Sequence, residues 1–387
     1  MVSRLLILLA VFGLQALEAA ILIKGLKIHG RSAAAIIVVF VIFCLPVFYI
    51  LWLQSHALQP PHLPANLVVK PAYAWHFNWL CFLVFMAPVI ILVRLGVWWF
   101  EGPESVITVM RTVVLIIIGL WGLISIGGIY GTSRPPVVEK VEFSMPGLPA
   151  EEDGLRVVQL TDMHVGWWNS EKEFCRAADM AADLGPDLLL ITGDMVDHNP
   201  DYVHRFADCL EDLRPRLGRY AIIGNHDVYT GRLPVVKRME ERGFVMLRKE
   251  WVELTDKGSS LVLAGLDDSG MNWTSDDPST KEIPDAVKGV PEDRPCILLK
   301  HRPLVFSDIE GLPIDLVVTG HTHGGQLKLP FGGPGLAHLT YRYAEGFHQK
   351  DGQMLYVSRG LGTVGWPFRV FCPPEVTLLV LRSPEKK

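Results

Sequence analysis

The chain has 387 residues with a formal net charge of −5, and half of its residues are hydrophobic. It contains no long basic run, which argues against nucleic acid as a partner. The mean hydropathy of +0.28 is high for a soluble protein, and nearly all of the apolar excess lies before residue 131. We therefore expect a membrane part followed by a soluble part.

Residues 1–130 hold four apolar stretches long enough to cross a bilayer, which takes about 20 residues. These predicted transmembrane helices lie near 5–23, 33–53, 77–100 and 112–130. Tryptophans cluster near the ends of the stretches, as in an interfacial aromatic belt. The first stretch also resembles a signal peptide, and its cleavage stays open, although the three spans that follow favour a retained helix.

The orientation of these spans is predicted from their basic residues. Lys24, Lys27 and Arg31 lie between the first two spans, and such a cluster favours the cytoplasmic side. With four spans, the C-terminal part would then lie outside the cytoplasm; basic residues in the opposite loops keep the margin small. Glu18 lies within the first span, where a carboxylate is a functional candidate; we expect it instead to lie near the helix end and reach the interface.

A soluble domain follows a breaker-rich linker at residues 131–136 and extends over 137–382. Spacing typical of a helix and a terminal glycine predict a helix over 171–185. The predicted strands are an edge strand at 137–145 and buried strands at 155–162, 186–194, 219–227, 296–301 and 315–321. This alternation indicates an α/β fold.

Polar side chains follow the ends of the five buried strands. Because ligands gather beyond the carboxyl ends of such strands, we expect the donors to meet at one rim. The candidate metal ligands are Asp162, His164, Asp194, Asn225, His301, His321 and His323. All offer oxygen or nitrogen, which suits Mn²⁺, Zn²⁺ or Fe²⁺. Seven donors are too many for one ion and suit two divalent ions, an arrangement that promotes in-line phosphoryl displacement.

The six cysteines include no CxxC pair, which argues against a zinc ribbon or a thioredoxin-like motif. The four in the soluble part are Cys175, Cys209, Cys296 and Cys372. Their dispersed positions establish neither a disulfide framework nor the redox compartment.

Five short motifs carry a family resemblance. They are "DMH" (162–164), "GDMVD" (193–197), "GNHD" (224–227), "KHRP" (300–303) and "GHTHGG" (320–325). In this order they resemble the motifs of the calcineurin-like metallophosphoesterase superfamily, and the match covers roughly residues 137–382. Residues 320–330 and 358–379 resemble its membrane-associated bacterial branch, similar to YaeI and YkuE. The resemblance implies a four-layer αββα sandwich.

The resemblance also implies a role for each donor. Asp162, His164 and His323 would hold one ion, and Asn225, His301 and His321 the other. Asp194 would bridge the two ions. Asp197 stands where purple acid phosphatases have a tyrosine ligand, so that type of site is not expected; whether Asp197 supports a ligand or caps a turn stays open.

Catalytic roles are implied for the two residues after Asn225. His226 would protonate the leaving oxygen or stabilise the charged transition state, and Asp227 would orient His226. Candidate phosphate-binding residues are Arg302, Arg359 and Arg369, of which Arg302 follows His301 directly.

We therefore expect a metal-dependent phosphoric ester hydrolase anchored in the bacterial plasma membrane, with its catalytic domain outside the cytoplasm. It would cleave phosphomonoesters or phosphodiesters, with lipid-linked substrates such as phospholipids among the candidates, by attack of metal-bound hydroxide. The alternative is a membrane sensor or transport component with a regulatory or inactive phosphoesterase domain. The natural substrate, the identity of the metals and the oligomeric state are left open by the sequence.

Overall fold

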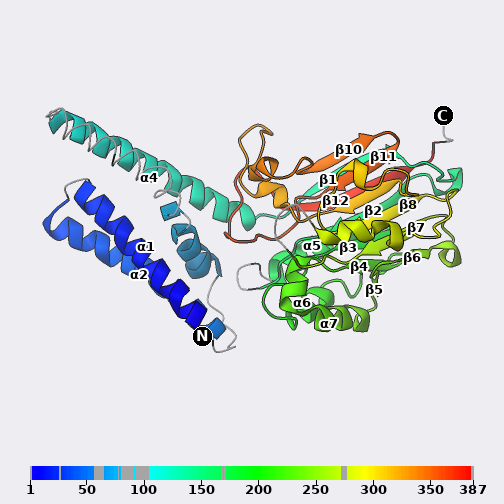
Figure 1. Ribbon diagram of the computed structural model, residues 1–387, viewed down its shortest axis with the longest axis horizontal. Coiled ribbons are helices and arrows are strands. Elements are labelled where there is room, and N and C mark those ends of the chain that lie inside the picture. The colour runs from blue at the N-terminus through cyan, green and yellow to red at the C-terminus, as the bar shows by residue number, and fades with distance from the viewer. Residues whose placement is uncertain are drawn as a thin grey trace. The chain divides into compact units, whose positions relative to one another are not determined.

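The computed structural model describes residues 2–25, 28–55, 65–76, 78–79, 91, 104–166, 169, 171–271 and 277–384. The chain divides into two compact units (Figure 1). One comprises Met1–Tyr130 with Gly365–Phe368, and the other comprises Gly131–Val364 with Arg369–Lys387.

The first unit is helical. It contains α1 (Val2–Gly25), α2 (Gly30–Ser55), the short π-helix η1 (Ala65–Val69) and α4 (Glu104–Thr132). Helices α1, α2 and α4 cover the first, second and fourth predicted spans. Within the described residues, one helical segment, Leu115–Thr132, is long and apolar enough to cross a membrane by length and composition. Four spans therefore remain a prediction, and the third, 77–100, lies almost entirely outside the described residues.

The side chain of Glu18 does not lie where the sequence predicted. Its side chain is buried rather than directed to an interface. Gln15, one turn earlier on α1, donates a hydrogen bond of 2.5 Å from Nε2 to Glu18 Oε2, and Trp75 Nε1 donates to Gln15 Oε1 at 3.1 Å. Packing within this unit thus encloses a carboxyl group whose position along the helix suggested exposure.

The second unit contains two six-stranded sheets. The order in the first is β1 (Val137–Ser144), β12 (Glu375–Arg382), β2 (Leu155–Leu160), β3 (Leu188–Thr192), β4 (Arg219–Ile222) and β5 (Val245–Met246). The order in the second is β10 (Gly346–Lys350), β11 (Gln353–Val357), β9 (Leu316–Thr319), β8 (Cys296–Lys300), β7 (Val262–Leu266) and β6 (Glu250–Glu253). All six predicted strands are present, and β1 lies at a sheet edge as predicted.

Buried side chains hold these sheets in layers. The inner faces share one apolar cluster, in which Val157 and Leu190 of the first sheet meet Leu299 of the second. Helices α5 (Glu171–Asp183), α6 (Tyr202–Asp208) and α7 (Asn225–Glu241) cover the outer face of the first sheet (Figure 1). The short helix α8 (Ile283–Ala286) and the 3₁₀ turn η5 (Phe306–Asp308) cover the second. The result is an αββα arrangement with one thin helical layer.

Parallel pairing places the candidate site. Strands β2, β3 and β4 run parallel in the first sheet, and β7, β8 and β9 run parallel in the second. The carboxyl ends within each sheet therefore lie at one edge. The predicted donors follow β2, β3, β4, β8 and β9 at these edges.

A disulfide joins two of the covering helices. Cys175 of α5 is bonded to Cys209, the residue that caps the C-terminus of α6. The two cysteines are 34 positions apart in sequence. The dispersed cysteine pattern had left this pairing open.

A buried ion pair lies at the C-terminal end of β8 and allows a prediction about the stability of the domain. Lys300 Nζ lies 2.7 Å from Asp277 Oδ2, and both side chains are 1% exposed. Burial opposes charge on Asp277, but the charge and hydrogen bond of Lys300 outweigh it and hold the pKa below its usual range. We expect Asp277→Asn to lower the free energy of unfolding by about 3 kcal/mol, because it leaves a buried ammonium without its counter-ion. Thermal melting would measure this.

Asp285→Asn is the matched control, because Asp285 pairs with Lys249 at the surface and is 69% exposed. The free energy of unfolding of this control variant should fall by less than about 1 kcal/mol. The depressed pKa of Asp277 also fixes the pH dependence. Its contribution is complete above the ordinary aspartate pKa of about 3.9 and is lost as the pH falls below that value. Equal melting losses for the two variants would contradict the assignment.

Candidate metal centre

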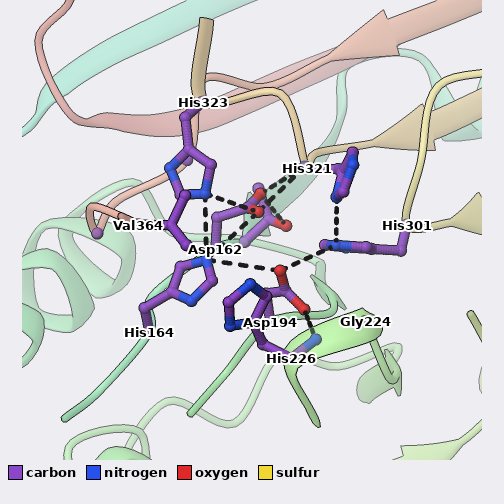
Figure 2. Close-up of polar contacts among 12 residues, drawn as sticks. Asp162, His164, Asp194, Gly224, His226, His301, His321, His323 and Val364 are labelled. Atoms are coloured by element: carbon purple, nitrogen blue, oxygen red, sulfur yellow. Dashed lines mark hydrogen bonds and ion pairs between the residues drawn. The ribbon is translucent and has the colours of Figure 1, made fainter. Parts of the chain in front are cut away.

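The first group of predicted donors comes together around Asp162. Its Oδ1 lies 3.4 Å from His323 Nε2 and 3.9 Å from His164 Nε2. The two histidine Nε2 atoms are 3.1 Å apart, and Figure 2 shows their rings directed toward one another. These three residues could jointly hold a metal ion.

A second group forms around His301. Its Nε2 lies 3.1 Å from Asp194 Oδ2 and 3.3 Å from His321 Nδ1. Asn225 lies in sequence between Gly224 and His226, which both approach Asp194. Its buried Oδ1 has no hydrogen-bond partner among the residues that the structure describes. Because an unpaired buried acceptor is costly, a cation beside it would satisfy an otherwise unexplained group.

Asp194 lies between the two groups (Figure 2). Its Oδ2 is 3.5 Å from His164 Nε2 in addition to its contact with His301. Its Oδ1 accepts a hydrogen bond of 2.8 Å from the backbone N–H of His226. One carboxylate oxygen thus faces both groups, and the other is fixed by the backbone.

Partners on the far side of three imidazoles orient them. His301 Nδ1 lies 2.8 Å from the carbonyl oxygen of Thr192, His164 Nδ1 lies 3.0 Å from Asp197 Oδ1, and His321 Nε2 lies 2.9 Å from the hydroxyl of Tyr341. If each of these ring nitrogens carries the proton, the nitrogen that faces the site is free to bind a cation.

Five of the seven donors have left-handed backbone conformations, which non-glycine residues adopt rarely. They are Asp162 (φ 54°), His164 (46°), Asp194 (51°), His321 (69°) and His323 (52°). Such conformations occur at functional sites and require support from the surrounding structure.

Two glycines provide that support by allowing close approach. A Cβ atom on Gly224 would lie 2.2 Å from Asp194 Oδ1, and one on Gly320 would lie 2.2 Å from Asp162 Oδ2. Gly224 and Gly320 are therefore required by their contact with the two carboxylates.

Without cations, protons neutralise much of the charge in this cluster. Burial opposes charge on His301, but the charges of Asp194 and Asp162 outweigh it and raise its pKa to about 10. Burial likewise opposes charge on Asp194, but the neighbouring histidines hold its pKa well below the usual range. Cation binding must displace protons, so we expect affinity to weaken as the pH falls.

His226 lies beside Asp194 and is 26% exposed. Its Nδ1 is 2.7 Å from Asp197 Oδ1, the same oxygen that contacts His164. Burial lowers the pKa of His226, but the charge of Asp194 and the contact with Asp197 raise it to about 9. His226, His164 and Asp194 also form a third group with metal-binding geometry, so geometry alone allows His226 to be a ligand as well.

Asp227 differs from the sequence-based expectation. Its Oδ2 accepts from the backbone N–H of Gly224 at 2.9 Å, and its Oδ1 accepts from Met195 and Val196 at 3.0 and 3.2 Å. Asp227 therefore ties together two donor-bearing loops. The contact with His226 that we expected of Asp227 is made by Asp197.

The three predicted phosphate-binding arginines all have internal partners. Arg302 is fully buried and pairs with Asp268 through two bonds of 2.7 and 2.9 Å. Arg359 contacts Glu375 and Glu139, each at 2.8 Å. Buried Arg369 donates to backbone carbonyls, and its Nη2 lies 3.2 Å from His323 Nδ1. These contacts do not support a direct role in binding phosphate for any of the three.

Tyr341 has no signal in the sequence, yet its hydroxyl contacts a candidate ligand. We expect Tyr341→Phe to weaken Mn²⁺ affinity by about tenfold, because His321 loses the partner that orients its ring. Calorimetric titration of the metal-free protein would measure the change. Tyr343→Phe, two positions along the chain, should leave the affinity unchanged. Equal affinities in wild type and Tyr341→Phe would remove Tyr341 from the site.

The donors fit divalent cations by three criteria. They offer oxygen and nitrogen only, which suits Mn²⁺, Zn²⁺ or Fe²⁺. Pairs of ring nitrogens face each other at 3.1 and 3.3 Å, and in the described part of the chain the amide oxygen of Asn225 has no hydrogen-bond partner.

Comparisons with known proteins agree with this chemistry. The family profile described as "Calcineurin-like phosphoesterase" matches residues 155–325. An "Uncharacterized metallophosphoesterase" of Aquifex aeolicus is 33% identical over 247 residues, which cover 64% of this chain and 92% of that protein. The Bacillus subtilis "Uncharacterized metallophosphoesterase YkuE" is 31% identical and covers 68% of this chain and 93% of its own length. A Danio rerio "Transmembrane protein with metallophosphoesterase domain" is 30% identical, and the match covers 71% of this chain and 63% of that protein.

Proposed function

The chain belongs to the calcineurin-like phosphoesterase family, and from this premise we propose that it is a membrane-anchored phosphoesterase that holds two divalent cations. It hydrolyses phosphomonoesters or phosphodiesters. The observation that supports this most directly is the position of Asp194, whose Oδ2 faces His164 and His301 at 3.5 and 3.1 Å. A carboxylate shared by two ligand groups is what a two-ion site requires.

In this proposal, Asp162, His164 and His323 hold one cation. Asn225, His301 and His321 hold the other, and Asp194 is shared. When bound, the two cations would neutralise charge on the phosphate oxygens and activate a water molecule.

His226 acts as the general acid. The charges around it favour the protonated ring, with a pKa raised to about 9. Its Nδ1 is engaged by Asp197 at 2.7 Å, so Nε2 is the nitrogen left to deliver a proton to the leaving oxygen. Asp197 holds the ring in that orientation and also supports His164.

The membrane anchor is supported by the apolar segment Leu115–Thr132 and by the name of the Danio rerio relative. We propose that the anchor lies in the plasma membrane of a bacterium, with the catalytic domain outside the cytoplasm. The Cys175–Cys209 disulfide supports this orientation, because disulfides persist in oxidising compartments. The basic residues Lys24, Lys27 and Arg31 support it independently.

The test uses the full chain, purified in detergent and stripped of metal. Aryl phosphomonoester and bis-aryl phosphodiester hydrolysis would be measured before and after Mn²⁺ is added, together with the melting temperature. We expect added Mn²⁺ to switch on hydrolysis of at least one substrate and to raise the melting temperature. A metal-stabilised protein that cleaves neither substrate would favour the regulatory or inactive alternative. Absence of any metal effect would count against the two-ion site itself.

A further inference from the structure

A hairpin of unusual composition extends from the metal centre. Residues 326–343 read QLKLPFGGPGLAHLTYRY and contain Lys328 and Arg342 but no aspartate or glutamate. The hairpin begins three residues after His323 and returns to Tyr341, whose hydroxyl lies 2.9 Å from His321 Nε2. Both ends are therefore tied to the candidate ligands.

Backbone hydrogen bonds give the hairpin a defined shape. Leu336 N donates to Leu327 O at 3.0 Å, and Leu329 N donates to Pro334 O at 3.1 Å. At its base, Lys328 N donates to Val370 O at 3.0 Å, and the Lys328 side chain pairs with Glu345. The loop is an ordered projection with a firm base.

The tip of this projection is apolar and exposed. Phe331 is fully exposed, Leu339 is 84% exposed, and Leu329 and Leu336 are exposed beside them. Phe371, which follows the hairpin's partner Val370, is 63% exposed. We call Leu329, Phe331, Leu336 and Leu339, which all belong to the hairpin, the apolar tip. Such side chains next to an active site mark an interaction surface.

The backbone at the tip adds a second observation. Phe331 has φ 60°, and Gly333 N closes the turn on Pro330 O at 3.3 Å. A bulky residue in the left-handed region is an outlier that costs free energy, of the order of 1 kcal/mol or more. That strain holds a phenyl ring out in solvent, where its exposure is also unfavourable. Burial of the ring in another medium would remove the cost of its exposure and so offset the backbone strain.

The short connection between the apolar segment and β1 favours the lipid bilayer as that medium. Leu115–Thr132 is apolar enough to cross a membrane, and β1 begins at Val137. Five Cα-to-Cα steps of about 3.5 Å bound this connection at roughly 17 Å. If the segment spans the bilayer, as the proposed function holds, the domain begins close to the lipid surface. Arg342 is exposed, and an exposed arginine on a loop without acidic residues suits the boundary of an anionic membrane.

We propose that the apolar tip inserts into the bilayer and presents the metal centre to phosphoesters carried by membrane lipids. A cleft of about 640 Å³ adjoins the hairpin and is lined by Thr340, Tyr341 and Arg342. Because Tyr341 both lines this cleft and contacts His321, the cleft gives a lipid head group a place next to the centre. The inference rests on the proposed membrane anchor and names the substrate class of the same site.

Insertion is tested with the full chain reconstituted in phosphatidylcholine–phosphatidylglycerol vesicles. Phe331→Cys and Leu339→Cys would carry an environment-sensitive fluorophore, and Glu310→Cys, at an exposed polar turn, is the matched control. Within the described residues, the free cysteines Cys44, Cys296 and Cys372 are buried, and labelled wild type, which also carries Cys81, sets the background. We expect lipids with an acyl-chain spin label to quench the tip probes at least about twofold more than the control, whereas aqueous iodide quenches them less.

Two outcomes would overturn the proposal. Iodide quenching at the tip equal to that at Glu310 would leave the tip in water. Protection from both quenchers would mean that a protein, either a partner or a second copy of this chain, covers it. Neither readout depends on catalysis, so both remain decisive if the phosphoesterase assignment fails.

The substrate class has its own test. Phe331→Ser combined with Leu339→Ser would be assayed on a soluble aryl phosphodiester and on the same aryl group joined to a vesicle-embedded lipid phosphate. We expect the ratio of the rate on the lipid-borne substrate to the rate on the soluble substrate to fall by about tenfold. The reason is that the variant lacks two apolar side chains that wild type would bury in the bilayer. An unchanged ratio would count against lipid presentation. If wild type hydrolyses neither substrate, that result would instead contradict the proposed function.

Discussion

Asp194→Asn is expected to reduce aryl phosphoester hydrolysis by at least about 10³-fold, which corresponds to about 4 kcal/mol of transition-state stabilisation. The backbone N–H of His226 donates to Oδ1, so the asparagine carbonyl oxygen should take that place. The amide nitrogen would then face His164 and His301, where it has no lone pair for a cation. The variant loses both the shared charge and the shared ligand atom.

Metal content measured by mass spectrometry would accompany the rate. Wild type should retain two ions per chain, and Asp194→Asn should retain fewer. Asp212→Asn removes the same charge at an exposed position and should leave both quantities unchanged. An Asp194→Asn protein with two ions and a wild-type rate would refute the shared-carboxylate assignment.

His226→Gln should lower the rate by about 10²- to 10⁴-fold, the range for loss of a general acid. The loss should grow as the leaving group becomes more basic, because a poor leaving group needs its proton most. A series of aryl and alkyl phosphoesters would measure this trend. The variant should keep its full metal content.

Metal content also decides between the two roles that geometry allows for His226. Loss of an ion in His226→Gln would make His226 a ligand and would contradict the acid assignment. Asp197→Asn offers a second check, since it removes a carboxylate that raises the pKa of His226. An acid must be protonated to act, so the rate falls as the pH rises through its pKa. In Asp197→Asn this alkaline fall should begin at lower pH than in wild type.

The candidate donors come together as expected because each follows a short buried strand, and parallel strands bring their ends together. The sequence predicted none of the other six strands, which are β5, β6, β7, β10, β11 and β12. Strand β5 has two residues and β6 has four, too few to show an alternation. Strand β12 pairs parallel with β1 from more than 200 positions away, and local pattern holds no information on such pairing.

Side-chain direction explains two of the corrections. Arg302 follows His301 in the bend after β8, where the two consecutive side chains leave the backbone in different directions. With His301 directed at Asp194, Arg302 faces Asp268 instead. Asp227 follows His226 at the start of α7, where adjacent residues do not face each other. Spatial neighbours such as Asp197 and Tyr341 come from separate loops, and spacing along the chain does not reveal them.

The left-handed backbone at Asp162, His164, Asp194, His321 and His323 has a consequence for how the domain could change under mutation. Glycine at such a position relieves strain, and each relief would make the metal-free domain more stable. Stability alone would therefore drive these five positions away from carboxylates and imidazoles. A domain that served only as a scaffold would be free to carry glycine there, whereas this chain carries a carboxylate or an imidazole at all five positions. These five side chains cost the domain stability, a cost that a metal site would explain and a purely structural role would not.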